Sequence, residues 1–469
     1  MSNHFDVVVI GGGPAGYAAA LYGAAAGLNI ALVEKSKLGG TCLHVGCIPA
    51  KELLETAAVF RTVSHASDFG VGTSAPTIDF SVTQVRKQGV IDNLTNGLSA
   101  LLKHRKVTVF DGVGSVFSAV DVKTVNVSGG ASGDVQLTAD NLVLAGGSVP
   151  RTIPGFDVDG TRIVTSDELL SLQTLPARAA VIGGGAIGIE FASMMTDLGT
   201  QVTVLEAMAN IIPGVDPAAA RVVERSLKGR GMEIRTNVMV SGQEAVDGAT
   251  RVSFGDGESI DVDLVVLAIG RRPFADLLGL DAVGIALDER GFIPVDENCL
   301  TSAPGVYAVG DVIATAQLAH IGFSEGMVAI RGILGEDPKP VDYQNVPWCI
   351  YCHPEVAFAG HTEESAKEAG FDVVTSTHKF TGNGRAMIVG ETDGLVKVIA
   401  EKNADGTAGR MLGVHMVGPW VTEQLGQGYL AINWEATVDD VAHFIQPHPT
   451  MSELFGETVM ALTGRGLHG

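Results

Sequence analysis

A short pattern of glycines and one acidic residue occurs twice in this chain, and this duplication limits the possible folds more than any other feature. The first copy spans residues 7–34 and the second spans residues 180–206. Corresponding positions are separated by 172 residues throughout (206 − 34, for example). Each copy begins with an apolar run, passes through G-x-G-x-x-G and ends in a second apolar run followed by glutamate. Each therefore predicts a strand, a glycine turn, a helix and a second strand.

This order of elements is typical of a dinucleotide-binding unit. The first glycine makes a tight turn, the second lets the backbone approach a pyrophosphate, and the third lets helix and strand pack closely. The helix N-terminus then faces the phosphates. One copy alone would be a weak indication. Two copies in the same context favour two bound dinucleotides over two glycine-rich turns without ligands, and two such sites suggest FAD and a nicotinamide cofactor.

The glutamate that closes each copy indicates which nicotinamide cofactor is used. Glu34 and Glu206 stand where a carboxylate accepts hydrogen bonds from ribose hydroxyls. A carboxylate repels a 2′-phosphate, and residues 207–210 supply no arginine to hold one. The second site should therefore prefer NAD over NADP.

Bulk properties narrow the class of protein. With 469 residues the chain is too long for one ordinary core, so about three domains are expected. The formal net charge of −22 argues against nucleic-acid and anionic-membrane binding, and it suits either plain solubility or docking to a basic partner. Because Phe5–Ile10 already reads as a buried strand and no apolar run reaches the roughly 18 residues of a membrane span, we expect a soluble, cytoplasmic protein.

Two of the five cysteines, Cys42 and Cys47, lie in a segment that opens a helix. On a regular helix they would be about 7.5 Å apart along the axis, and a disulfide tolerates a Cα separation of roughly 7 Å at most. If they are bonded, the turn must be irregular, and Gly46 supplies the freedom. A helix N-terminus also lowers the pKa of a thiol. Metal binding is the alternative, and it is weak because no second Cys/His pair with zinc spacing accompanies the motif, so no metal is expected.

The segment GGTCLHVGCIPAK, residues 39–51, resembles the redox-active disulfide of the pyridine nucleotide–disulfide oxidoreductases, and among them most resembles the dihydrolipoyl dehydrogenases. The resemblance runs nearly end to end, through residues 144–148, 307–311, 318–320 and 448–453. The chain departs from the usual pattern in having Gly146 for threonine, His44 for asparagine and Gln446 for histidine.

The resemblance implies how the catalytic residues act. Cys42 would meet the substrate thiol and Cys47 the flavin, while Lys51 lies near the flavin with Glu190 as its partner. His448 would act as the base, supplied by the partner subunit and oriented by Glu453. Because His448 precedes a proline, we expect extended backbone there, with Pro449 in the first turn of a helix and Glu453 about one turn further on.

The resemblance also implies the cofactor sites. The residues expected at FAD are Gly11, Gly13, Pro14, Ala15, Gly16, Glu34, Gly40, Thr41, Lys51, Gly147, Gly310, Asp311 and Ala319. Those expected at NAD are Gly183, Gly185, Ile187, Gly188, Glu206 and Gly270.

The expected fold is α/β, with two Rossmann-like dinucleotide-binding domains and an α+β C-terminal dimerisation domain. We place an FAD domain at residues 1–148, with a β-meander inserted at Lys106–Val127, and an NAD domain at 149–270. Residues 271–341 should complete the FAD site, and residues 342–469 should form the dimer interface. The resemblance implies a homodimer that oxidises dihydrolipoyl groups. It also implies docking to the subunit-binding module and lipoyl domain of an acyltransferase core, or to a glycine cleavage H protein.

Three alternatives stay open on the sequence. A glutathione-reductase type of enzyme is disfavoured by Glu206, and a mercuric-reductase type by the absence of a cysteine pair in residues 463–469. A flavoprotein kept only for binding is disfavoured by the intact catalytic residues. The remaining CxxC, Cys349 and Cys352, lies in a strand-like run where residues three apart point to opposite faces, so burial is favoured over a bridge.

Overall fold

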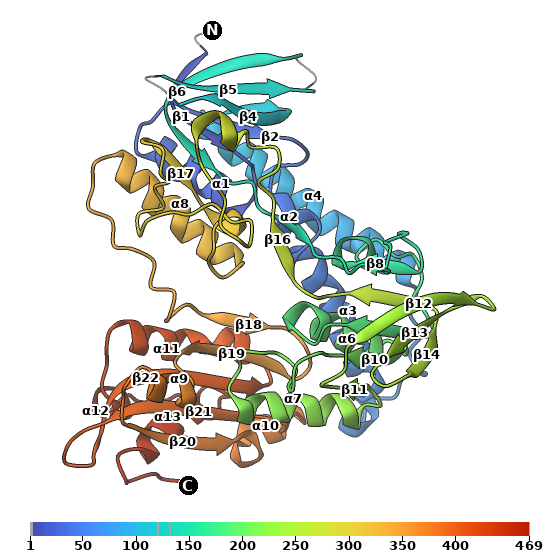
Figure 1. Ribbon diagram of the computed structural model, residues 1–469. Coiled ribbons are helices and arrows are strands. Elements are labelled where there is room, and N and C mark those ends of the chain that lie inside the picture. Colours follow the sequence, from blue (N-terminus) through green and yellow to red (C-terminus); the bar gives the residue numbers. More distant parts are fainter. Residues whose placement is uncertain (1–2, 120–121, 131–132, 469) are drawn as a thin grey trace.

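The computed structural model describes residues 3–119, 122–130 and 133–468 (Figure 1). Three large sheets organise these residues, one for each copy of the duplicated pattern and one near the C-terminus. The predicted α/β class, with two dinucleotide-binding units and a C-terminal α+β unit, is confirmed. The division into domains at residues 148, 270 and 341 stays a prediction. Within the described ranges, no helix is both long and apolar enough to cross a bilayer.

The first sheet is built around the first glycine pattern. Its order is β3-β2-β1-β6-β5-β4, with β17 beside β6. The parallel members are β1 (His4–Ile10), β2 (Ile30–Glu34), β3 (Thr108–Asp111), β6 (Val135–Leu144) and β17 (Val306–Ala308). Helices α1 (Pro14–Ala25) and α8 (Ala319–Ile333) pack against each other, and β1 is buried on both faces, as expected for a covered parallel sheet.

The inserted meander lies further along the chain than predicted. Thr108–Asp111, expected inside it, forms the parallel edge strand β3 beside β2. The antiparallel strands are β4 (Val113–Ser118), β5 (Lys123–Ser128) and the first half of β6. Residues 120 and 121 of the predicted meander lie outside the described residues. The error arose because side-chain periodicity does not distinguish a parallel edge strand from an antiparallel one.

The second sheet repeats the arrangement with the second glycine pattern. Its order is β11-β10-β9-β15-β8, and every pair in it is parallel. The strands are β8 (Ile163–Thr165), β9 (Arg178–Ile182), β10 (Gln201–Leu205), β11 (Glu233–Arg235) and β15 (Leu264–Leu267). Helix α6 (Ala186–Asp197) joins β9 to β10 just as α1 joins β1 to β2, and α7 (Pro217–Gly229) follows. A small antiparallel sheet is made by β12 (Val240–Val246), β13 (Ala249–Phe254) and β14 (Glu258–Val262).

After the second unit the chain returns to the first. Strand β16 (Arg271–Pro273) pairs antiparallel with β7 (Ser148–Pro150), so the outgoing and returning segments run side by side. The chain then supplies β17 and α8 to the first unit. This crossover places residues after 300 next to the first glycine turn.

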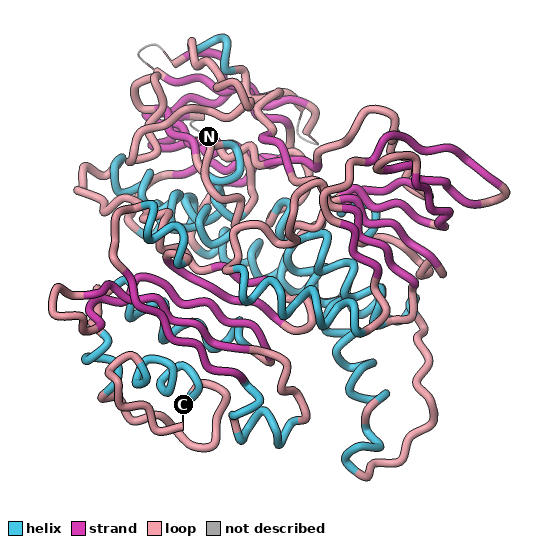
Figure 2. Tube along the Cα trace, turned by 60° about the horizontal axis from the view of Figure 1, so that its bottom comes forward, coloured by secondary structure: helices cyan, strands magenta, loops and turns pink. Residues whose placement is uncertain are grey.

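The C-terminal sheet is antiparallel, with the order β18-β19-β22-β21-β20. Its strands are β18 (Trp348–Ile350), β19 (Glu355–Gly360), β20 (Val373–Lys379), β21 (Leu395–Lys402) and β22 (Ala408–Gly418). Helix α11 (Val421–Asn433) packs on β19 and β22, and α13 (Glu453–Ala461) packs on β20 and β21. The chain ends beside these covering helices (Figure 2). A shared apolar core joins this sheet, through Ile350 and Val356, to α6 of the second unit.

Gly188 offers a test of the close helix–strand packing in the second unit. An added Cβ there would lie 2.0 Å from the Gly183 carbonyl oxygen, closer than any real contact. We expect Gly188→Ala to cost about 1–3 kcal/mol of stability, to lower the Tm by several degrees and to weaken NAD⁺ binding. Gly229→Ala is the control, because nothing lies within 4 Å of its Cβ position, and it should leave both unchanged. Equal Tm values for the two variants, measured by differential scanning fluorimetry, would contradict the packing argument.

Candidate active site

Cys42 and Cys47 lie on two different helices separated by a sharp break. Cys42 is inside α2 (Gly40–His44), and Cys47 is the first residue of α3 (Cys47–Ser64). The irregular turn predicted between them is confirmed. The reason for glycine at position 46 differs from the one expected. Its φ is −148°, and an added Cβ would lie 2.9 Å from the Thr41 oxygen, so glycine is required by the close approach of the two helices.

The two cysteines are free thiols joined by a side-chain hydrogen bond, and they differ in acidity. The pKa of Cys47 is lowered to about 7 because it accepts the hydrogen bond from Cys42, with a further contribution from the charge of Lys51. The pKa of Cys42 is raised because its S–H is the donor and because it is buried. In the reduced pair, Cys47 is therefore the thiolate.

A partly buried ion pair lies one helical turn beyond Cys47. The Lys51 Nζ is 3.0 and 2.9 Å from the two carboxylate oxygens of Glu190, on α6 of the second unit. Burial pulls the pKa of Lys51 down, but the charge of Glu190 outweighs it and the net shift is upward. The backbone N–H of Tyr351 donates to Glu190 at 2.8 Å, and the Lys51 Nζ lies 4.9 Å from the centre of the Tyr351 ring.

Tyr17, on α1, was not singled out from the sequence and also faces the cysteines. Its pKa is raised to about 12, chiefly by burial and then by the charges of Cys42 and Cys47. Its ring packs on Phe323 of α8, with the ring centres 5.6 Å apart. The only sequence signal was an aromatic residue in the first turn after the glycine pattern.

His448 and Glu453 form the expected pair. The His448 Nδ1 lies 2.8 Å from the Glu453 Oε2, which leaves the Nε2 nitrogen directed away. Asn383 donates to the other oxygen of Glu453 at 3.3 Å and to the Thr450 carbonyl at 2.9 Å. Asn383 is thus a positioning residue that sequence reasoning missed, since it lies 70 residues away in the chain.

The helix that follows His448 starts later than predicted. α13 begins at Glu453, so Pro449 is outside the helix and Glu453 is in its first turn. The Thr450 hydroxyl accepts from the Glu453 N–H at 3.2 Å and donates to the Pro447 carbonyl at 2.7 Å. These local side-chain bonds hold residues 450–452 in a turn in place of helix.

The sheet order separates His448 from the cysteines of the same chain. Tyr351, which contacts Glu190, directly follows β18 at one edge of the C-terminal sheet. α13 packs on β20 and β21, at the opposite edge (Figure 1). The His448 side chain is 78% exposed. The chain therefore brings together Cys42, Cys47, Lys51 and Glu190 and holds His448 with Glu453 elsewhere.

The first glycine turn has the shape a pyrophosphate needs. Gly11 has a φ of +109°, and Gly13 precedes α1 with no side chain capping the helix. Glu34 accepts the Gly12 N–H at 2.6 Å, which fixes the turn. α2 covers the turn closely, because a Cβ on Gly40 would lie 2.7 Å from the Gly13 Cα. The predicted residues Pro14, Ala15 and Gly16 form the first turn of α1, and Thr41 lies in α2.

Asp311 lies where the returning segment meets the first unit. The Ser148 hydroxyl donates to Asp311 at 2.5 Å, and Arg271 donates to the Ser148 hydroxyl at 2.7 Å. Burial raises the pKa of Asp311. Glu325, fully buried in α8, accepts the Gly310 N–H at 2.6 Å. Gly147 precedes Ser148, and Ala319 begins α8. Arg271 and Glu325 were not predicted from the sequence. The available signal was a charged residue within a largely apolar or glycine-rich segment.

The second glycine turn repeats the first. Gly183 has a φ of +106°, and Gly185 precedes α6 with no capping side chain and open space around its Cβ position. Glu206 accepts the Gly184 N–H at 2.5 Å and the Met208 N–H at 2.7 Å. Ile187 and Gly188 lie in the first turn of α6, and Gly270 follows β15. The residues at both turns thus fit a dinucleotide, and Glu206 is held rigidly where it would meet a ribose.

The CxxC pair is unbridged, as predicted. Cys352 is buried and its sulfur lies 3.2 Å from the Pro354 oxygen, while the Cys349 sulfur lies 4.0 Å from the Thr422 oxygen. Burial, followed by the negative charges of Glu355 and Glu423, raises the pKa of Cys349 to about 11. Neither thiol has the low pKa that disulfide exchange requires.

Comparison with known proteins agrees with this geometry. Residues 5–326 match the family model described as pyridine nucleotide-disulphide oxidoreductase, and residues 346–459 match its dimerisation domain. A dihydrolipoyl dehydrogenase of Bacillus subtilis (strain 168) is 40% identical over 479 residues, which cover all of both chains. Crystalline LpdA from Mycobacterium tuberculosis has a TM-score of 0.91 at 26% identity, with 97% of this chain and 99% of that chain covered.

A structure of RclA, an HOCl-induced flavoprotein disulfide reductase from Escherichia coli, is also similar. It has a TM-score of 0.86 at 28% identity and covers 97% of this chain and 99% of that chain. The family matches extend over most of the chain, and the relative from Bacillus subtilis aligns along its whole length. The chain therefore belongs to the pyridine nucleotide-disulphide oxidoreductase family.

Proposed function

We propose that this chain oxidises dihydrolipoyl groups and reduces NAD⁺, using FAD and the Cys42–Cys47 pair. The observation that carries the proposal is the thiol pair itself. Cys47 has a pKa of about 7 beside the partly buried Lys51–Glu190 pair, in a chain aligned end to end with dihydrolipoyl dehydrogenases.

The cofactor residues follow from the two glycine turns. The first turn, with Glu34 and the Ser148–Asp311 pair, would hold FAD, and the second, with Glu206, would hold NAD. When bound, FAD supplies the acceptor that takes an electron pair from the thiols and delivers it as hydride to NAD⁺. Lys51 would place a positive charge beside Cys47, where it stabilises the thiolate.

The thiol chemistry can be written with the residues of this chain. His448 of a second subunit removes a proton from one dihydrolipoyl thiol, and Glu453 stabilises the imidazolium. In the oxidised protein, where Cys42 and Cys47 form a disulfide, the resulting thiolate attacks the Cys42 sulfur, forms a mixed disulfide and breaks the Cys42–Cys47 bond, so that Cys47 leaves as a thiolate. The second dihydrolipoyl thiol then gives up its proton and attacks the first sulfur, which closes the lipoyl disulfide and breaks the bond to Cys42; the Cys42 sulfur leaves and takes up that proton. Two electrons pass from the substrate to the cysteine pair.

The cofactor and substrate preferences test the proposed function directly. We expect rapid turnover with dihydrolipoamide and NAD⁺ and little turnover with glutathione disulfide and NADPH, because the Glu206 carboxylate repels a 2′-phosphate. The measurement is the initial rate of NADH formation or NADPH loss with FAD-loaded protein. The reverse preference would support the alternative, an NAD(P)H-dependent disulfide reductase, which the likeness to RclA keeps as the second candidate.

A mixed dimer tests whether His448 acts on the cysteines of the partner. Homodimers of Cys47→Ser and of His448→Gln should both be nearly inactive. If the base acts across the interface, a mixed dimer has one intact site, since Cys42 and Cys47 of one chain meet His448 of the other. Refolded or co-expressed equal mixtures should then recover about a quarter of wild-type activity, because half of the dimers are mixed and each has one of two sites. No recovery would mean that each chain uses its own His448.

The acidic charge of the chain suits docking to a basic partner in a larger complex. We infer a homodimer that binds the basic subunit-binding module of an acyltransferase core, or a glycine cleavage H protein, because the chain carries a net charge of −22. Affinity for a recombinant subunit-binding module should fall at least tenfold between about 50 and 300 mM salt, where charge interactions are screened. Affinity that does not change with salt would rule out electrostatic docking.

A further inference from the structure

One face of α6 holds the loop that leaves the first strand of the C-terminal sheet. Glu190, Ser193 and Asp197 lie three and four residues apart, which places them on the same side of the helix. Glu190 accepts the Tyr351 N–H at 2.8 Å, and Ser193 accepts the His353 N–H at 3.0 Å. Alternate backbone N–H groups of the loop are thus bound by side chains of α6.

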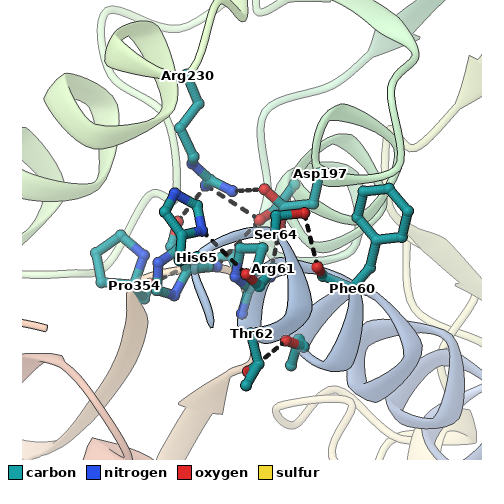
Figure 3. A network of polar contacts seen from close by, with 12 residues as sticks. Phe60, Arg61, Thr62, Ser64, His65, Asp197, Arg230 and Pro354 are labelled. Carbon is teal, nitrogen blue, oxygen red and sulfur yellow. Dashed lines mark hydrogen bonds and ion pairs between the residues drawn. The ribbon is translucent and has the colours of Figure 1, made fainter. Parts of the chain in front are cut away.

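Arg230 completes this arrangement from the end of α7. Its guanidinium donates to the His353 carbonyl, to the Ser193 hydroxyl at 3.3 Å and to the Asp197 carboxylate. Figure 3 shows Arg230 and Arg61 converging on Asp197 beside Pro354. In the loop segment 351–353, Arg230 therefore binds the carbonyl at one end and Glu190 binds the N–H at the other.

Asp197 also ties α3 to α6 a second time. Arg61, ten residues after Lys51 on α3, lies 2.5 Å from Asp197, so the two helices are joined by Lys51–Glu190 near the thiols and by Arg61–Asp197 further away. The Asp197 side chain is 2% exposed. If Arg230 is removed, Arg61 still neutralises this buried carboxylate, so the folded core should survive the change.

His353 lies next to the two arginines of this cluster. Burial, followed by the charges of Arg61 and Arg230, lowers the pKa of His353 to about 3. His353 is therefore neutral over the pH range in which the enzyme works, and its contacts with Arg230 and Ser193 are made by backbone atoms. Protonation of the His353 ring is therefore not needed for these contacts.

We propose that Arg230 is a positioning residue for the Lys51–Glu190 pair, because it holds the His353 carbonyl and thereby presents the Tyr351 N–H to Glu190. The proposal deepens the proposed function, on which it rests. With the N–H in place, the Glu190 carboxylate accepts hydrogen bonds from both Lys51 and Tyr351, and Lys51 can still stabilise the Cys47 thiolate. Without it, Glu190 draws Lys51 more strongly, the thiolate loses stabilisation and the pKa of Cys47 rises.

Replacing Arg230 leaves in place the ionisable groups that contribute most to the pKa of Cys47. The ionisable groups that face Cys47 or its lysine are Cys42, Lys51, Glu190, Tyr17, Tyr351 and Cys349. Arg230 is not among the largest contributors to the pKa of Cys47, and its side-chain contacts are with Asp197, Ser193 and the His353 carbonyl. A shift after its removal would have to pass through the loop and Glu190.

The pH dependence of Cys47 alkylation tests the proposal. In FAD-loaded Cys42→Ser protein, the rate of iodoacetamide modification is followed by mass spectrometry of the peptide that contains Cys47. Adding Arg230→Met should raise the pH midpoint by about half to one unit. Arg225→Met is the matched control, because Arg225 is on the same helix and pairs with Asp393 at 3.4 Å on the surface. A midpoint that moves no further with Arg230→Met than with Arg225→Met overturns the proposal.

A second variant decides the matter if Arg230→Met fails to fold. Ser193→Ala removes the acceptor of the His353 N–H and changes no charge. It should shift the midpoint in the same direction by a smaller amount, and an unchanged midpoint overturns the proposal. The readout needs neither dihydrolipoamide nor NAD⁺. If the wild-type protein fails to oxidise dihydrolipoamide, the proposed function fails, while the comparison of midpoints still stands on its own.

Discussion

The partly buried ion pair between Lys51 and Glu190 is the contact that joins the two nucleotide units. Lys51 belongs to α3, which lies between β2 and β3 of the first unit, and Glu190 belongs to α6, the helix that follows the second glycine turn. Glu190 is buried and would lose its charged partner without Lys51, so the two units are held in a defined relation where they meet. Cys47 lies one turn from Lys51, so the same contact joins the units and adds to the acidity of the thiol, after the larger effect of the Cys42 hydrogen bond.

The third unit contributes to the same pair through its backbone. Tyr351 places an N–H on Glu190, and the loop that carries it rests on α6 and on Arg230. The opposite edge of the C-terminal sheet carries His448, which is 78% exposed and lies away from the cysteines of its own chain. In the proposed function, the two edges of this sheet would have different roles: one supports the thiol site of its own chain, and the other would present His448 to a second subunit.

The sequence predicted what depends on local pattern. The duplicated glycine turns, the broken helix between Cys42 and Cys47, and the His448–Glu453 pair all follow from residues close together in the chain. It did not predict Arg271, Glu325, Asn383 or Arg230, whose partners lie from 15 to 123 residues away. It also predicted too early a start for the helix that begins at Glu453, because the Thr450 hydroxyl binds backbone groups that a helix would otherwise use.

The two glycine turns share their chemistry and differ in what covers them. α2, which carries Cys42, lies against Gly13, whereas nothing approaches the Cβ position of Gly185. A molecule seated at the first turn would be enclosed by the redox helix, and one at the second would face open space. The same kind of glycine turn could therefore enclose one dinucleotide and leave the other free to exchange. The different covering of the two turns would make a dinucleotide slower to leave the first turn than the second.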